Sequence, residues 1–184
     1  MPAMLFPQSP LPVHRRNWLL AAACAAAGGL ARPLCAAEAF EWRPWPAGKR
    51  VPALNLPLAD GTPWRLAAQS GHVVLANFWA SWCAPCLQEM PELEAFSAQQ
   101  GANGTQVVGI ALDDPGPTQA MLERLGVTYP NLIDAPGPAD AGVRLGNPAG
   151  VLPYSVLVSA EGRVLKTKIG PFEHRQDIAA WARP

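Results

Sequence analysis

The chain has 184 residues, of which 49% are hydrophobic and 15% are charged, and its formal net charge is +0. This length fits one domain with an additional segment, and the hydrophobic fraction is sufficient for a buried core. A net charge of zero argues against a general attraction to nucleic acid or to an anionic membrane surface. The 21 prolines are scattered, which argues against a proline-rich disordered chain.

Residues 1–39 have the pattern of a targeting segment. Arg15 and Arg16 precede an alanine-rich apolar stretch, Trp18 to Leu30, and small residues follow, with a possible cleavage site after Ala37 or two residues later. The apolar stretch is shorter than the roughly 20 residues that a membrane-spanning helix needs. We therefore expect a cleaved signal peptide, with an uncleaved anchor as the alternative. The general secretory route and the twin-arginine route both remain open, and either would lead to a bacterial periplasm.

Residues 40–184 are expected to form one α/β domain. Continuous apolar runs predict buried strands, and apolar residues spaced by three and four predict helices. Alternating strands and helices in the middle predict parallel pairing, and a late hairpin predicts an antiparallel edge. In chain order, we expect a hairpin at 53–58 and 63–66, a strand at 73–79, a helix at 84–100, a strand at 107–112, a helix at 115–125, a strand at 129–133, a helix at 139–145, strands at 154–158 and 164–169, and a helix at 173–181.

Cys83 and Cys86 are the two cysteines outside the expected targeting segment, and they lie where a buried strand gives way to a helix. Unpaired N–H groups and the dipole at a helix N-terminus favour a thiolate at Cys83. Pro85 falls in the first helical turn, where its missing N–H costs nothing. The spacing of three brings Cys86 within bonding reach. We therefore expect Cys83 to attack a disulfide and Cys86 to resolve the mixed disulfide.

Two other uses of this cysteine pair are disfavoured. A structural zinc site needs four ligands, but a second cysteine pair is absent and the three histidines lack ligand spacing. A purely structural disulfide across so short a loop would restrain little of the unfolded chain. The pattern therefore indicates a redox-active disulfide without a metal or a bound cofactor.

Three motifs between Val51 and Trp181 resemble the thioredoxin superfamily, and specifically its TlpA/ResA-like periplasmic branch. They are the WCxPC motif at Trp82–Cys86, the Glu-Met-Pro sequence at Glu89–Pro91, and the segment Gly150–Val158, which is similar to the family's cis-proline segment. The resemblance implies a thioredoxin-like fold. Such a fold has a central mixed β-sheet flanked by helices, and in this branch it carries an N-terminal β-hairpin and a central αβ insertion.

The resemblance also implies roles for individual residues around the cysteines. Pro153 is expected to be cis and to lie beside the cysteines, and Leu152 is expected to offer backbone groups to an extended client. The alternative is an ordinary proline at an edge strand. Trp82 and Pro85 are expected to contact partner proteins, whereas Trp79 is expected in the core.

One departure from the thioredoxins proper concerns the proton path. Thioredoxins have a buried aspartate where this chain has Asn77, and an amide cannot take up the proton. Glu89, one helical turn beyond Cys86, is the nearest carboxylate that could take that role. The alternative is that Glu89 is a solvated helix residue.

These features together predict a periplasmic thiol–disulfide oxidoreductase that reduces client proteins, such as apocytochrome c or proteins with copper-site cysteines. A membrane electron donor of the DsbD/CcdA type would keep it reduced. The alternatives are a disulfide-forming oxidant or isomerase, and a copper-binding chaperone. His174 is expected to be a surface residue rather than a copper ligand. A peroxidase is disfavoured because Ala80 stands where a serine or threonine would be needed.

Overall fold

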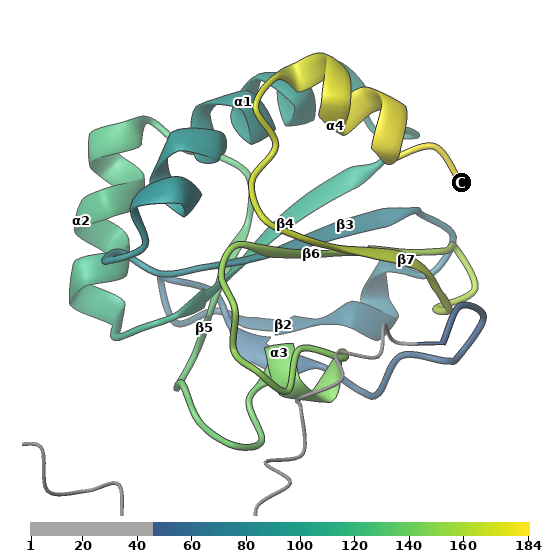
Figure 1. Cartoon of the computed structure of the whole chain (residues 1–184), viewed down its shortest axis with the longest axis horizontal. Helices are drawn as coiled ribbons and strands as arrows, with labels where there is room; N and C mark the ends of the chain where they lie inside the picture. Colours follow the sequence, from purple (N-terminus) through teal and green to yellow (C-terminus); the bar gives the residue numbers. More distant parts are fainter. Residues whose placement is uncertain (1–45) are drawn as a thin grey trace, which may run out of the picture. The chain divides into compact units, whose positions relative to one another are not determined.

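The computed structural model describes residues 46–184 (Figure 1). The expected targeting segment at 1–39 and residues 40–45 of the expected domain lie outside the described residues. Within residues 46–184, none of the helices combines the length and the apolar character that crossing a membrane requires.

The domain is organised around a five-stranded sheet with the strand order β5-β4-β3-β6-β7. The first three of these strands are parallel, whereas β6 runs antiparallel to β3 and β7 runs antiparallel to β6. The expected parallel middle and antiparallel edge are therefore confirmed. The strands are β3 (Val74–Trp79), β4 (Gln106–Leu112), β5 (Asn131–Asp134), β6 (Tyr154–Val158) and β7 (Val164–Ile169).

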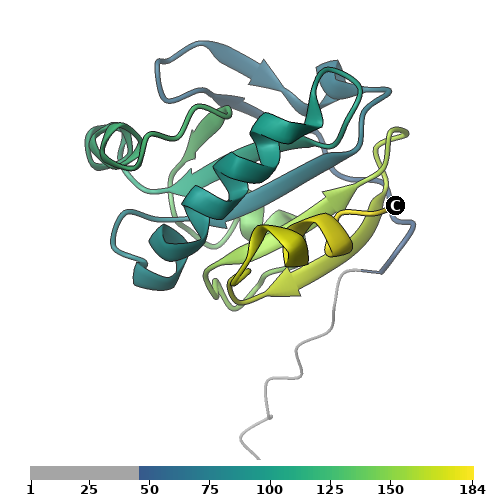
Figure 2. The same ribbon diagram turned by 90° about the horizontal axis from the view of Figure 1, so that it is seen from above.

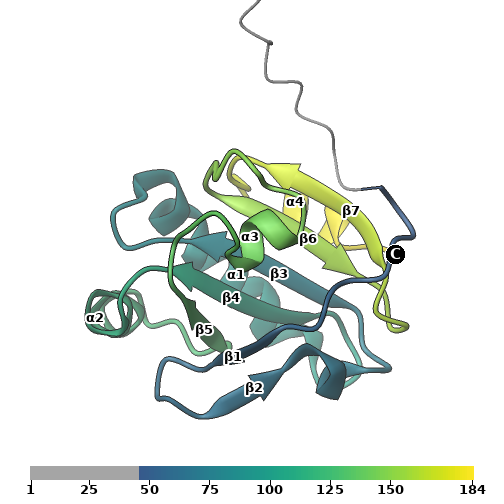
Figure 3. The ribbon, with the colours of Figure 1, turned by 90° about the horizontal axis from the view of Figure 1, so that it is seen from below.

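Helices cover both faces of this sheet. Helices α1 (Ala84–Gln100) and α4 (Arg175–Trp181) lie together on one face (Figure 2). Helix α2 (Pro115–Leu125) packs Leu122 into the same apolar cluster as the start of α1. The short helix α3 (Ala141–Arg144) lies on the opposite face (Figure 3). The αβ unit in the middle of the chain, α2 followed by β5, extends the sheet at its edge.

An N-terminal hairpin shares the second face with α3 (Figure 3). Its strands β1 (Asn55–Pro57) and β2 (Pro63–Arg65) form a separate two-stranded sheet, and a 3-10 helix, η1 (Leu66–Gln69), follows. The sequence pattern did not predict η1. A bridge between Leu58 and Leu132 attaches the hairpin to β5, so the outer edge of the sheet is partly covered.

Alternate residues of β3 point to opposite sides of the sheet, as the pleat requires. Phe78 packs against the hairpin and α3, whereas Leu75 and Trp79 pack beneath the helices of the other face. Asn77 points to the same face as Leu75 and Trp79. The strand therefore places one buried amide under α1, among apolar neighbours.

Candidate active site

The two cysteines lie where β3 ends and α1 begins. Cys83 is the N-cap residue of α1, and Pro85 falls in the first turn. Cys83 and Cys86 form a disulfide with a Cα–Cα distance of 5.3 Å. Cys86 is fully buried, whereas Cys83 keeps 5% of its surface exposed and is flanked by the exposed residues Trp82 and Pro85. Cys83 is thus the sulfur that a partner can reach.

The segment before the cysteines is tied to the neighbouring strand. The backbone N–H and the hydroxyl of Ser81 both donate to Asp113 Oδ2, at 2.9 and 2.5 Å. Partial burial works to raise the pKa of Asp113, but the hydrogen bonds from Ser81 and from the N–H of Asp114 outweigh it, so the pKa lies below its usual value. Sequence reasoning missed this contact. The parallel register aligns Trp79 with Ala111, so the residues two positions further face each other.

Glu89 is a fully buried carboxylate on α1, three residues beyond Cys86. Its Oε1 accepts a hydrogen bond from Asn77 Nδ2 at 2.8 Å, and its Oε2 accepts one from the backbone N–H of Phe172, also at 2.8 Å. The interpretation of Glu89 as a solvated helix residue is therefore wrong. It lies in the inward-facing stripe of α1, whose other buried members are Cys86, Met90, Leu93 and Phe96.

Asn77 holds Glu89 from the side of the sheet. Its amide nitrogen donates to Glu89 and also to Ser155 Oγ, at 3.2 Å, and the register places Ser155 directly opposite it on β6. Asn77 Oδ1 is buried and has no hydrogen-bond partner among residues 46–184. The amide that replaces the thioredoxin aspartate is thus oriented to donate to a carboxylate. Sequence reasoning missed Ser155, although the β3–β6 pairing would have indicated it.

Burial controls the proton affinity of Glu89. Desolvation raises its pKa from 4.5 to about 7, although the hydrogen bonds from Phe172 and Asn77 and the positive charge of Lys168 oppose the increase. A carboxyl group with a pKa near neutrality can take up and release a proton under ordinary conditions.

The segment before β6 presents free backbone groups beside the cysteines. The Leu152–Pro153 peptide bond is cis, as the resemblance implies. The half-buried side chain of Leu152 packs against the cluster that contains both Cys83 and Cys86. The N–H and C=O of Leu152 form no hydrogen bond within residues 46–184. An extended chain could therefore pair with them.

Exposed apolar side chains gather around this segment. Among the described residues, the large hydrophobic side chains that are exposed are Trp82, Val151 and Ile169, with exposed fractions of 70%, 42% and 36%. Trp82 precedes Cys83, Val151 lies two residues before the cis-proline, and Ile169 pairs with Tyr154 directly after it. We call these three residues the apolar rim. Each of them adjoins either Cys83 or the cis-proline segment, in sequence or in strand register.

Trp79, in contrast, belongs to the core, as expected. Its indole Nε1 donates to Asn131 Oδ1 at 2.9 Å, and this bond crosses over Gly109 on the strand between them. A Cβ atom at position 109 would overlap Asn131 Oδ1. The hydrogen bond therefore requires glycine at this point of β4.

No group of three histidine, cysteine, aspartate or glutamate side chains within residues 46–184 is arranged to hold a metal ion. His174 is exposed and caps the N-terminus of α4. Its position agrees with the expected surface residue.

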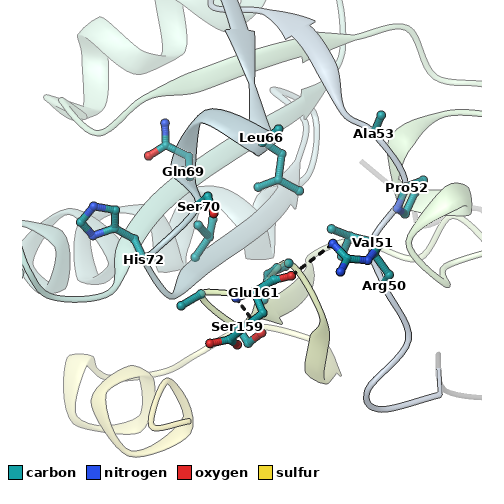
Figure 4. A pocket seen from close by; sticks show the side chains of 15 residues that line it. Arg50, Val51, Pro52, Ala53, Leu66, Gln69, Ser70, His72, Ser159 and Glu161 are labelled. Carbon is teal, nitrogen blue, oxygen red and sulfur yellow. Dashed lines mark hydrogen bonds between the residues drawn. The ribbon is translucent and has the colours of Figure 1, made fainter.

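A pocket of about 290 Å³, drawn in Figure 4, lies near the start of β3. It is lined by residues 50–53, by η1 and the residues that follow it, and by the β6–β7 turn. Arg50 Nη1 donates across it to the carbonyl oxygen of Glu161 at 3.5 Å. Val74 at the start of β3 belongs to its lining, whereas the cysteines follow the end of that strand. The pocket is separate from the cysteine site.

Comparison with known proteins identifies relatives that are named for thiol–disulfide exchange. Residues 46–181 match the Redoxin family. The chain is 36% identical to the thiol:disulfide interchange protein HelX of Rhodobacter capsulatus, over 68% of this chain and 69% of HelX. It is 28% identical to the thiol-disulfide oxidoreductase ResA of Halalkalibacterium halodurans, over 64% of this chain and 66% of ResA. The chain thus spans about two thirds of the length of both relatives.

A solved structure described as a thiol:disulfide interchange protein DsbE from Chlorobium tepidum superposes with a TM-score of 0.66. It is 28% identical in sequence, and the superposition covers 74% of this chain and 94% of that one. The thioredoxin-like fold that the motifs implied is therefore confirmed.

Proposed function

The chain belongs to the Redoxin family and is a thiol–disulfide oxidoreductase of the TlpA/ResA-like branch of the thioredoxin superfamily, and we propose from this that it reduces disulfides in client proteins outside the cytoplasm. The observation that carries the proposal is the arrangement of the pair. An accessible Cys83 at a helix N-terminus is bonded to a buried Cys86, beside a cis-proline segment with free backbone groups.

The proposed reaction is a two-electron exchange. In the reduced protein, the thiolate of Cys83 attacks one sulfur of the client disulfide, and the other client sulfur leaves as a thiolate that takes up a proton. Cys86 then loses its proton and attacks Cys83. The Cys83–Cys86 disulfide forms, and the second client sulfur leaves. Both client thiolates take their protons from solvent, so the client gains two electrons and two protons and the protein is left oxidised.

Glu89 is proposed to handle the proton of Cys86. Residues three apart on a helix are neighbours, so the carboxylate lies beside the buried sulfur. A carboxylate without a proton can accept one from Cys86 as that thiol attacks, and it can return the proton when the disulfide is reduced again. Its pKa of about 7 suits transfer in both directions.

The client is proposed to bind as an extended strand. Leu152 can pair with its backbone by strand addition, while the apolar rim contacts side chains on either side of the client cysteine. Pro85, exposed beside Cys83, adds to the same surface. Apocytochrome c and proteins with copper-site cysteines are the client classes that the family resemblance suggests. A membrane electron donor of the DsbD/CcdA type would restore the dithiol.

Site-directed variants test the pair. The purified protein should catalyse reduction of insulin by dithiothreitol, and Cys83→Ser should abolish this activity because the attacking thiolate is lost. Cys86→Ser should instead accumulate mixed disulfides with clients, because the resolving step is missing. Full turnover by Cys83→Ser would disprove the mechanism. The assigned order would be reversed if Cys83→Ser formed mixed disulfides through Cys86 while Cys86→Ser formed none through Cys83.

The direction of exchange needs its own measurement. We expect a reduction potential nearer to the value of about −270 mV typical of thioredoxin than to the value of about −120 mV of a strong oxidant. Equilibration with a series of dithiothreitol and glutathione buffers, followed by thiol alkylation, gives the potential. A value near the oxidising end would favour the disulfide-forming oxidant or isomerase instead.

A further inference from the structure

The loop after β7 contacts two parts of the site that lie far apart in the chain. The N–H of Gly170 donates to the carbonyl oxygen of Pro153 at 2.9 Å. Two residues later, the N–H of Phe172 donates to Glu89 Oε2 at 2.8 Å. One short loop, residues 170–172, therefore contacts both the cis-proline segment and the buried carboxylate.

Lys168 fastens this loop. Its ammonium group donates to the carbonyl oxygens of Gly170 and Pro171, at 2.8 and 2.6 Å, and lies 4.8 Å from the centre of the Phe172 ring. The side chain is half-buried at the end of β7. Each residue of the loop is thus held by the same cation, through two hydrogen bonds and one cation–π contact.

The charge of Lys168 also acts on Glu89, whose pKa it lowers against the effect of burial. Tyr129 also interacts with Glu89: burial and the charges of Glu89 and Glu94 raise the pKa of Tyr129. Lys168 is therefore the cation opposite the carboxylate on this side of α1.

The groups on β3, β6 and α1 that contact or adjoin Glu89 are uncharged in the oxidised protein. Asn77 from β3 and Ser155 from β6 carry no charge, and Cys86 on α1 is in the disulfide. At the start of α4, the side chain of Asp177 accepts from the N–H of His174, and the N–H of Arg175 donates to Glu92 on α1.

We propose that Lys168 is a positioning residue for disulfide exchange, because it holds the 170–172 loop so that Phe172 stays hydrogen-bonded to Glu89 while Gly170 stays hydrogen-bonded to Pro153. Without the ammonium group, the loop loses the donor for two of its carbonyls, and Glu89 loses both a nearby positive charge and the constraint on its Phe172 partner. The buried carboxylate then holds its proton to higher pH. This inference rests on the proposed role of Glu89 in proton transfer.

The chain offers a matched control for Lys168. Lys166 lies two residues earlier on the same strand, donates to the carbonyl oxygen of Arg183 at 2.6 Å, and lies 5.8 Å from the centre of the Trp181 ring. It makes the same kinds of contact at the far end of α4, and it contacts neither Glu89 nor the 170–172 loop. A change that appears in Lys168→Met and not in Lys166→Met is thus specific to the position.

The experiment follows the Glu89 carboxyl by carbon NMR in the oxidised protein, with the resonance assigned from its loss in Glu89→Gln. We expect the titration midpoint to rise by about 0.5–1 pH unit in Lys168→Met, less than the full effect of a close ion pair. The midpoint should stay at the wild-type value in Lys166→Met, and Lys168→Arg should restore that value. The pH profile of insulin reduction should move in the same direction.

The possible failures are distinguishable. A wild-type midpoint in folded Lys168→Met would overturn the positioning role, even if Glu89→Gln still alters the pH profile of exchange. An exchange profile unaffected by Glu89→Gln would instead overturn the proposed proton transfer, and the positioning role would fall with it.

Discussion

Replacement of Glu89 by glutamine should remove a large part of the pH dependence of stability. Between pH 4.5 and about 7, the folded state keeps the Glu89 proton while the unfolded chain has released it. The unfolded state therefore binds fewer protons, and the stability falls as the pH rises. One pH unit of pKa difference is worth 1.36 kcal/mol, so a pKa of about 7 against 4.5 corresponds to about 3 kcal/mol.

This contribution is fully present below pH 4.5 and is lost once the pH has passed the folded pKa of about 7. Denaturant unfolding of the oxidised protein at intervals from pH 4.5 to 8.5 measures it. The difference in unfolding free energy between wild type and Glu89→Gln should change by about 3 kcal/mol over this range, in favour of the variant at high pH. Because glutamine cannot satisfy both donors, the variant starts from a lower stability in acid.

Glu92→Gln is the matched control, since Glu92 lies on the same helix and accepts a backbone hydrogen bond from Arg175. The effect of Glu89→Gln is read against that of Glu92→Gln at each pH. A wild-type minus Glu89→Gln difference that stays constant with pH, within about 0.5 kcal/mol, would refute the reasoning. Glu89→Gln should also slow disulfide exchange near neutral pH by ~10–100-fold, as expected for the loss of one general acid–base group.

Three further changes test other parts of the structure. Gly109→Ala should destabilise the fold by about 1–3 kcal/mol in denaturant unfolding, because the added methyl group overlaps Asn131; an unchanged midpoint would disprove the close approach. Trp82→Ala should lower kcat/KM for protein clients about tenfold and leave the rate with a small disulfide unchanged, since truncation of an exposed aromatic anchor weakens docking alone; equal losses with both substrates would count against a docking role. Asp113→Ala should cost about 1–2 kcal/mol by removing the acceptor for Ser81, and this loss should disappear as the pH falls through the lowered pKa of Asp113. A loss that persists in acid would contradict it.

Local signals in the sequence were sufficient for the strands, the helices and the cysteine pair. The apolar run that forms β3 is followed within a few residues by Cys83 and by the periodic pattern of α1, and these neighbours interact through short segments of chain. The antiparallel edge also followed from adjacent segments. The 3-10 helix η1 was missed because its four residues are too few to show a period.

The surroundings of Glu89 could be predicted only in part. Its spacing of three from Cys86 placed it near the sulfur, but its hydrogen bond from Phe172 and the charge of Lys168 that acts on it come from about 80 residues further along the chain. No local pattern links such distant segments. The contact between Asn77 and Ser155 was predictable in principle, because correct pairing of β3 with β6 would have brought the two residues face to face.

The hydrogen bond from Trp79 to Asn131 passes over the backbone of β4 and joins three parallel strands through side chains. Substitution at any one of the three positions leaves the other two poorly matched: a larger residue at 109 displaces the amide, and loss of either the indole or the amide leaves a buried polar group unpaired. Substitutions at these three positions should therefore be correlated among relatives. Relatives should carry tryptophan, glycine and asparagine together, or should have replaced the indole and the amide as a pair.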